Sequence, residues 1–327
     1  FPYTTLFDLL AYRRADFASA RDHFEQAAAL DRHNYEAAYY LALTLLSLGE
    51  EARGRSMLKR LVALGRCVSE AAQLLARTAE CTRPGSGNRS DLARPELLRD
   101  APGQWLELAS AYQASGCTQR AIDLLQRGCD DHGRVDDSPL VHYVLAQYLE
   151  QNDESETAAN ERQRARKSDP THCFPWRLED YCVLRETVGK SQSDWLARYL
   201  LGTWLASRGR TGEAMEVWTE AAEIDDSFAP LLRNIGWGSW HWDEDAEAAA
   251  QWYTRAIERN RGEYRLYFEL DRVMEAAERP ALQRLELLRS APEKVRQLWQ
   301  VAARTAAVLV ALERWDEALT LLKSHDF

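Results

Sequence analysis

The sequence predicts an all-α protein, built as a superhelix of stacked helix pairs. Glycine and proline are scarce, with 16 and 10 among 327 residues, and both fall below the usual ~7% and ~5%. Apolar residues recur at spacings of three and four, which is the period of an amphipathic helix. A sandwich of many strands needs a turn about every 8–12 residues, and this chain lacks the turn residues for that.

The clearest helix pair lies at 105–128. Its first helix carries aromatic, leucine and alanine side chains on one face, and its second helix carries alanine, leucine and glycine. A turn at Gly116 separates the two helices. The positions that form this pattern are Trp105, Leu108, Ala109, Tyr112, Gly116, Ala121, Leu125 and Gly128.

The same arrangement returns along the chain at a nearly constant interval. Ala20 and Gly54 occupy corresponding positions 34 residues apart, and Ala214 and Ala249 are 35 residues apart. Such a period is the signature of a helical repeat protein, and it predicts roughly seven to nine pairs, each stabilised by stacking on its neighbours. Further copies lie at 17–61, 145–170, 201–221, 235–256 and 315–322, with weaker agreement at 171–190 and 264–290.

Small residues recur where the two helices of a pair must approach. Ala109, Gly202 and Gly236 follow a leucine or isoleucine of the first helix, and Ala121 and Ala214 open second helices. Side chains of this size allow helix axes to come within ~8–10 Å of each other. We therefore expect these residues to lie in the seam of each pair.

A stretch rich in proline and glycine at 82–103 interrupts the repeats and predicts a linker. It divides the chain into N-terminal helical repeats at 1–81 and a repeat array at 104–327. Residues 1–7 resemble the translation of a common DNA-sequencing adapter, so we interpret them as an assembly artefact, with a native segment as the alternative. Together with the missing initiator methionine, this interpretation predicts that the chain is a fragment.

The repeat resembles the tetratricopeptide repeat, whose period is about 34 residues. The order of several motifs is also similar to that of a bacterial family that joins a tetratricopeptide array to a mutarotase-like β-sandwich domain of unknown function. This second resemblance implies a fragment from which the sandwich domain is missing. The motifs are Phe174–Glu179, Asp194–Trp195, Tyr199–Gly202, Arg233–Trp237, Glu269–Asp271 and Trp315–Leu319.

Charge and cysteine content exclude several function classes. The chain has 51 acidic and 41 basic residues, a net charge of −10, and binding to nucleic-acid phosphates needs a basic surface instead. The six cysteines form neither a C-x-x-C pair nor a metal-finger spacing, and no apolar run is long enough to cross a bilayer. We therefore expect a cytoplasmic protein with reduced cysteines that binds neither nucleic acid nor membrane.

No catalytic motif appears in the chain, since both H-E-x-x-H and G-x-S-x-G are missing from the sequence. His241 with Asp243, Glu244 and Asp245 has metal-ligating side chains, but a solvated acidic turn between paired helices is the favoured interpretation. The sequence thus predicts no catalytic residue, no metal and no cofactor, and it leans towards a protein that is not an enzyme.

Candidate binding residues come from the geometry of the first helix in each pair, which usually lines the concave face. Positions i, i+4 and i+7 of that helix share one side, facing away from the seam. Several of these positions carry aromatic or arginine side chains, which are enriched at binding hot spots. The predicted groove residues are Tyr143, Tyr199, Arg233, Trp237, Trp240 and Arg272.

Two functions fit this groove. The favoured one is a non-catalytic scaffold whose concave face contacts a protein, a peptide or the missing domain of its own full-length chain. The alternative is the helical part of a carbohydrate-active enzyme or sugar-binding protein, in which Arg233, Trp237 and Trp240 help to shape a sugar site. In a third interpretation, the rings only pack against a neighbouring repeat or the missing domain.

Overall fold

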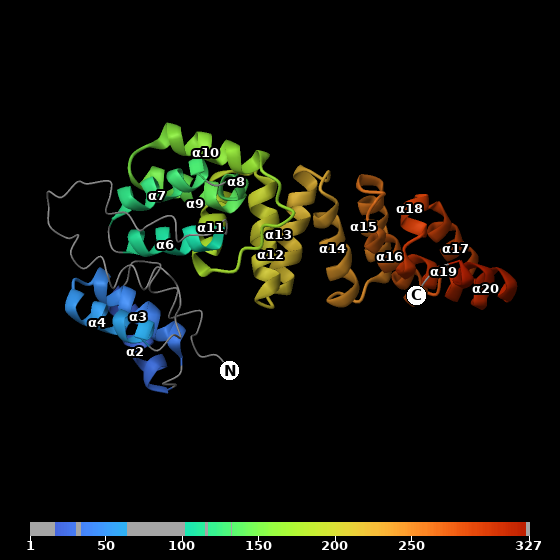
Figure 1. Cartoon of the computed structure of the whole chain (residues 1–327), viewed down its shortest axis with the longest axis horizontal. Helices are drawn as coiled ribbons and strands as arrows, with labels where there is room; N and C mark the ends of the chain where they lie inside the picture. The colour runs from blue at the N-terminus through green and yellow to red at the C-terminus, as the bar shows by residue number, and fades with distance from the viewer. Residues whose placement is uncertain (1–16, 31–33, 64–101, 115–116, 132, 325–327) are drawn as a thin grey trace. The chain divides into compact units, whose positions relative to one another are not determined.

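The computed structural model describes residues 17–30, 34–63, 102–114, 117–131 and 133–324, and throughout these stretches the regular elements are α-helices (Figure 1). The predicted all-α, helical-repeat class is confirmed. Within the predicted linker at 82–103, only Pro102 and Gly103 are described, and they begin a helix. Residues 1–7 and Gly116 also lie outside the described residues. None of the described helices has the length and apolar character needed to cross a membrane.

The chain forms two compact units, which we treat separately. Unit 1 comprises Phe1–Cys173 with Arg177–Val183, and unit 2 comprises Phe174–Trp176 with Leu184–Phe327. In unit 1, α3 packs on α4, α6 on α7 and α9 on α10. Its helices are α2 (Phe17–Leu30), α3 (Tyr35–Ser47), α4 (Glu51–Ala63), α6 (Pro102–Ala114), α7 (Thr118–Asp131), α8 (Gly133–Asp136), α9 (Pro139–Gln151), α10 (Ser155–Lys167) and the first part of α11 (Leu178–Lys190).

Unit 2 repeats the same pairing, with α12 on α13, α14 on α15 and α19 on α20 (Figure 1). Successive pairs also contact each other, through α13 with α14 and through α15 with α16. Its helices after α11 are α12 (Trp195–Ser207), α13 (Thr211–Ile224), α14 (Ala229–His241), α15 (Ala246–Arg259), α16 (Tyr264–Ala276), α17 (Ala281–Ser290), α18 (Glu293–Arg296), α19 (Trp299–Ala311) and α20 (Trp315–Lys323).

The turns between paired helices share one backbone conformation. A residue with positive φ follows the first helix, and the next amide donates back to a carbonyl five residues earlier, as from Arg210 to Leu205 at 3.0 Å. This is a Schellman cap, which satisfies the last carbonyls of the helix. The positive-φ residues are Gly49, Asp153, Gly209, Glu278 and Glu313, and Glu244 holds the same conformation in the turn from α14 to α15.

The seams between paired helices are as tight as the small residues predict. A Cβ atom added to Gly202 would stand 2.4 Å from the Trp218 ring, and one added to Gly236 would stand 3.0 Å from Tyr253. The alanines that open the second helices have no exposed surface, as Ala214 illustrates. The predicted role of these residues in close helix packing is therefore confirmed.

Candidate functional site

Four of the six predicted groove residues come together on α14 and α16 of unit 2. Arg233, Trp237 and Trp240 lie on α14, and Arg272 lies on α16. Two direct interactions join the helices here. The Arg233 guanidinium is paired with Glu269 of α16, and the Arg272 guanidinium lies 5.3 Å from the ring centre of Trp240.

The ion pair between Arg233 and Glu269 is bidentate. Arg233 Nε donates to Glu269 Oε2 at 2.8 Å, and Nη2 donates to Oε1 at 2.5 Å. Burial disfavours the charged guanidinium, but Glu269 outweighs it and raises the pKa of Arg233 above its ordinary value. Two parallel hydrogen bonds give the contact a defined orientation, so this pair links α14 directly to α16.

The aromatic side chains beside this ion pair form a connected layer. Trp237 stacks on His241 with ring centres 4.4 Å apart, and the Trp240 ring meets His241 edge-on at 4.5 Å. Trp237 is 36% exposed, and Arg272 is exposed above Trp240. We call Arg233, Trp237, Trp240, His241 and Arg272 the α14–α16 surface.

The two predicted tyrosines do not join this surface. Tyr143 lies on α9 in unit 1 and is 1% exposed, and Tyr199 lies on α12 and is 5% exposed. The Tyr199 ring packs edge-on against Phe228 with centres 5.1 Å apart, and its carbonyl accepts a hydrogen bond from Trp218 Nε1. Both tyrosine rings are therefore enclosed by protein rather than available to a ligand at the surface.

The acidic sequence around His241 forms a turn, as its favoured interpretation predicted. His241 Nδ1 lies 3.0 Å from the Trp237 carbonyl oxygen. Glu244 has a φ of 55°, and the Asp245 carboxylate caps α15 by accepting from the Ala248 amide at 2.9 Å. The Asp245 carboxylate thus caps a helix N-terminus, and Glu244 contributes its backbone conformation to the turn.

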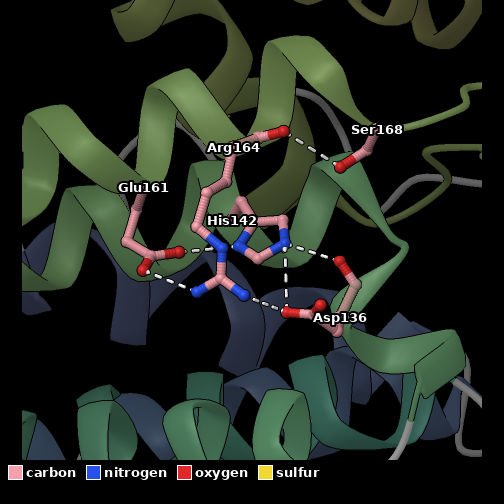
Figure 2. Close-up of polar contacts among 5 residues, drawn as sticks. All are labelled: Asp136, His142, Glu161, Arg164 and Ser168. Atoms are coloured by element: carbon pink, nitrogen blue, oxygen red, sulfur yellow. Dashed lines mark hydrogen bonds and ion pairs between the residues drawn. The ribbon is translucent and has the colours of Figure 1, made fainter.

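Sequence reasoning missed a buried polar cluster in unit 1 (Figure 2). Pro139 opens α9, and His142 follows one turn later with 1% exposure. His142 Nδ1 lies 2.6 Å from Glu161 Oε2 of α10, and Nε2 lies 2.6 Å from the carbonyl oxygen of Asp136, the last residue of α8. Histidine therefore links three helices through its two ring nitrogens.

Arg164 completes this cluster. Its Nη1 donates to Glu161 Oε1 at 3.1 Å, and its Nη2 pairs with the Asp136 carboxylate (Figure 2). Burial alone would raise the pKa of Glu161, but His142 and Arg164 outweigh it and hold that pKa below its ordinary value. The sequence signal was weak because Glu161 comes from the next helix, 19 residues after His142, where no local motif connects them.

Comparison with known proteins gives one family match, in the N-terminal part of the chain. The family described as tetratricopeptide repeat matches residues 11–78. Residues 11–78 contain tetratricopeptide repeat sequence. The later pairs share the period, the capped turns and the tight seams of the described helices, so the chain is an array of stacked helix pairs. The predicted link to a mutarotase-like domain stays a prediction.

Two solved structures are similar to parts of this chain. MamA is 11% identical and covers 64% of this chain and 97% of its own, with a TM-score of 0.33. YrrB, described as a TPR protein with an unusual peptide-binding site, is 16% identical and covers 78% of this chain and 97% of its own, with a TM-score of 0.27. No curated protein matches the chain.

Proposed function

We propose that this chain is a non-catalytic scaffold that binds a protein or peptide through its α14–α16 surface. The observation that carries the proposal is the exposed Trp237 ring beside the stacked Trp240 and Arg272 side chains. Tryptophan and arginine dominate the energetics of protein interfaces, because they bury large areas and make directed polar contacts.

The side chains of the α14–α16 surface are already ordered without a partner. Glu269 fixes Arg233 through two hydrogen bonds, and His241 holds the Trp237 ring in a stack. Side chains that are already ordered lose less entropy on binding. This supports a recognition role in which the tryptophans contact the partner and the ion pair maintains their positions.

The chemistry of the surface defines the partner. An aromatic or aliphatic side chain packs on Trp237, and a carboxylate within the same segment meets the exposed Arg272 guanidinium. A peptide segment with these two features fits, whether it belongs to another protein or to the sandwich domain that the motif order implies.

The carbohydrate alternative uses the same residues differently. An exposed indole face such as that of Trp237 suits a sugar ring, and this observation keeps the alternative open. Glycoside hydrolysis additionally needs two carboxyl groups on either side of the scissile bond. Both oxygens of Glu269, the carboxylate beside Arg233, are already engaged by that arginine, which favours a binding role over a hydrolytic one.

Selection from a random peptide library tests the proposal, with a panel of neutral and acidic oligosaccharides as the second arm. We expect wild-type protein to select peptides with an apolar and an acidic side chain, and the Trp237→Ala variant to lose them. Trp315→Ala is the matched control, because Trp315 is exposed on α20, away from this surface. Trp237-dependent binding to a sugar without any peptide selection would replace the proposal with the carbohydrate alternative.

A further inference from the structure

We propose that Cys129, Asp136 and His142 form a Zn²⁺ site in unit 1. The three donors come from α7, α8 and α9, and one ligand atom from each lies within 4.8 Å of the others. Thiolate, carboxylate and imidazole are the groups that bind zinc in proteins. The site is separate from the α14–α16 surface and does not depend on the function proposed for it.

The distances suit a small ion after a modest contraction. Zinc binds sulfur at about 2.3 Å and nitrogen at about 2.0–2.1 Å, so tetrahedral donors stand roughly 3.5 Å apart. His142 Nε2 is 3.8 Å from Asp136 Oδ1, close to that separation. Asp136 ends the four-residue helix α8, and its Oδ1 would exchange the ion pair with Arg164 for the bond to the metal.

The second ring nitrogen of His142 has the partner that a metal-binding histidine requires. Its Nδ1 faces Glu161 Oε2 at 2.6 Å, and Arg164 holds the other oxygen of that carboxylate. Donation from Nδ1 to a carboxylate recurs around zinc-bound histidines, and it leaves Nε2, which here faces the Asp136 carbonyl, as the ring nitrogen that would bind the ion. Glu161 is therefore assigned as the positioning residue that aims Nε2 at the metal.

The site also combines a dry interior with an open side. His142 is 1% exposed and Cys129 is 9% exposed, whereas the Asp136 side chain is 38% exposed. A metal ion can thus enter past Asp136, and a water molecule on that side supplies the fourth ligand. On binding, the Cys129 thiol and His142 Nε2 release any proton they carry, and the Nε2 contact with the Asp136 carbonyl is replaced by the metal bond.

Cobalt(II) substitution tests this assignment with a readout specific to sulfur. We expect one Co²⁺ per wild-type chain, a thiolate-to-cobalt charge-transfer band in the near ultraviolet, and loss of that band when Zn²⁺ is added. Cys129→Ser should abolish the band, whereas Cys173→Ser, which removes another buried thiol, should retain it. Far-ultraviolet circular dichroism of each variant establishes that it is folded.

Two further variants separate ligation from folding. Glu161→Gln should keep the charge-transfer band but weaken zinc binding by about 10–100-fold, as loss of an outer carboxylate does. Should Cys129→Ser not fold, Asp136→Asn at the exposed ligand should weaken Zn²⁺ binding by at least about tenfold. The proposal is overturned if wild-type protein shows no charge-transfer band, if the band persists unchanged in Cys129→Ser, or if Asp136→Asn binds Zn²⁺ as tightly as wild type.

Discussion

The indole ring of Trp218 lies so close to Gly202 that a Cβ atom on the glycine would stand 2.4 Å from the ring. Since Trp218 is 4% exposed and its Nε1 donates to the Tyr199 carbonyl, the ring cannot move away without losing that hydrogen bond. Gly202 therefore sets how closely α12 and α13 pack. We expect Gly202→Ala to lower the free energy of unfolding by about 1–3 kcal/mol through overpacking.

Urea denaturation followed by circular dichroism measures this effect. Gly212→Ala is the matched control in the partner helix, because nothing lies within 4 Å of its added Cβ atom. Its midpoint should stay constant or rise slightly, since alanine favours a helix over glycine. If Gly202→Ala and Gly212→Ala had the same urea midpoint, the close contact between Gly202 and Trp218 would not limit the stability of the protein.

At the turns between paired helices, we expect a substitution by glycine to increase the stability of the protein. Glu278 has a φ of 53° after α16, a conformation that costs a residue with a side chain about 1–2 kcal/mol. Glycine adopts it freely but loses more entropy on folding. We expect Glu278→Gly to raise the free energy of unfolding by about 0.5–1 kcal/mol.

The same substitution inside a helix is its control. Glu286 lies exposed within α17, so Glu286→Gly should destabilise the protein by about 1 kcal/mol. Thermal denaturation of wild type and of both variants gives the melting temperatures to be compared. A lower melting temperature for Glu278→Gly would refute the assigned role of positive φ at this turn.

Asp271 links three helices of unit 2. It has no exposed surface, and its oxygens accept from Arg284 Nε at 2.9 Å and from Arg304 Nε at 2.5 Å. Removing this charge leaves the Arg284 and Arg304 guanidinium groups with the exposed Glu275 carboxylate as their remaining charged partner. We expect Asp271→Asn to cost about 3 kcal/mol or more, measured as a shift in the urea midpoint, whereas Asp243→Asn in the exposed turn should have no measurable effect.

Burial should control thiol chemistry in this chain. It raises the pKa of Cys173 to about 12, so only about one thiol in ten thousand is ionised at pH 8. Because the thiolate is the nucleophile, its alkylation rate should rise about tenfold per pH unit below that pKa. Iodoacetamide at pH 8 should modify half-buried Cys182 in the native protein and leave Cys173 unmodified. Peptide mass mapping measures the labelling of each cysteine, and Cys173 should become labelled once the chain is unfolded. Equal labelling in the native state would contradict this.

Most of the fold could be predicted from the sequence because it depends on local spacing. Gly202 and Gly236 mark seams because the facing Trp218 and Tyr253 rings leave no room for a side chain, and Gly209 marks a turn because glycine adopts positive φ without strain. The positive φ of Glu278 and Glu313 at the equivalent turns could not be predicted, because glutamate rarely adopts that conformation. Here the hydrogen-bonded cap imposes a conformation that the residue itself disfavours.

The candidate sites were less predictable, for two physical reasons. Helical spacing places Tyr199 of α12 and Trp237 of α14 on the same predicted outward side of successive first helices, but the neighbouring pair covers Tyr199 with Phe228 and leaves Trp237 exposed. Which position is covered depends on contacts between repeats, and period alone does not define them. The cluster around His142 likewise depends on Glu161 from another helix and on a short helix, α8, that no spacing indicated.

The affinity of a library-selected peptide for wild-type, Trp237→Ala and Trp315→Ala protein tests the central claim most directly. Fluorescence anisotropy with a labelled peptide gives the three dissociation constants. If the α14–α16 surface is the recognition site, Trp237→Ala should weaken binding by about 30-fold or more, the effect of losing a hot-spot residue, and Trp315→Ala should leave it unchanged. A dissociation constant for Trp237→Ala within about twofold of wild type would contradict the account.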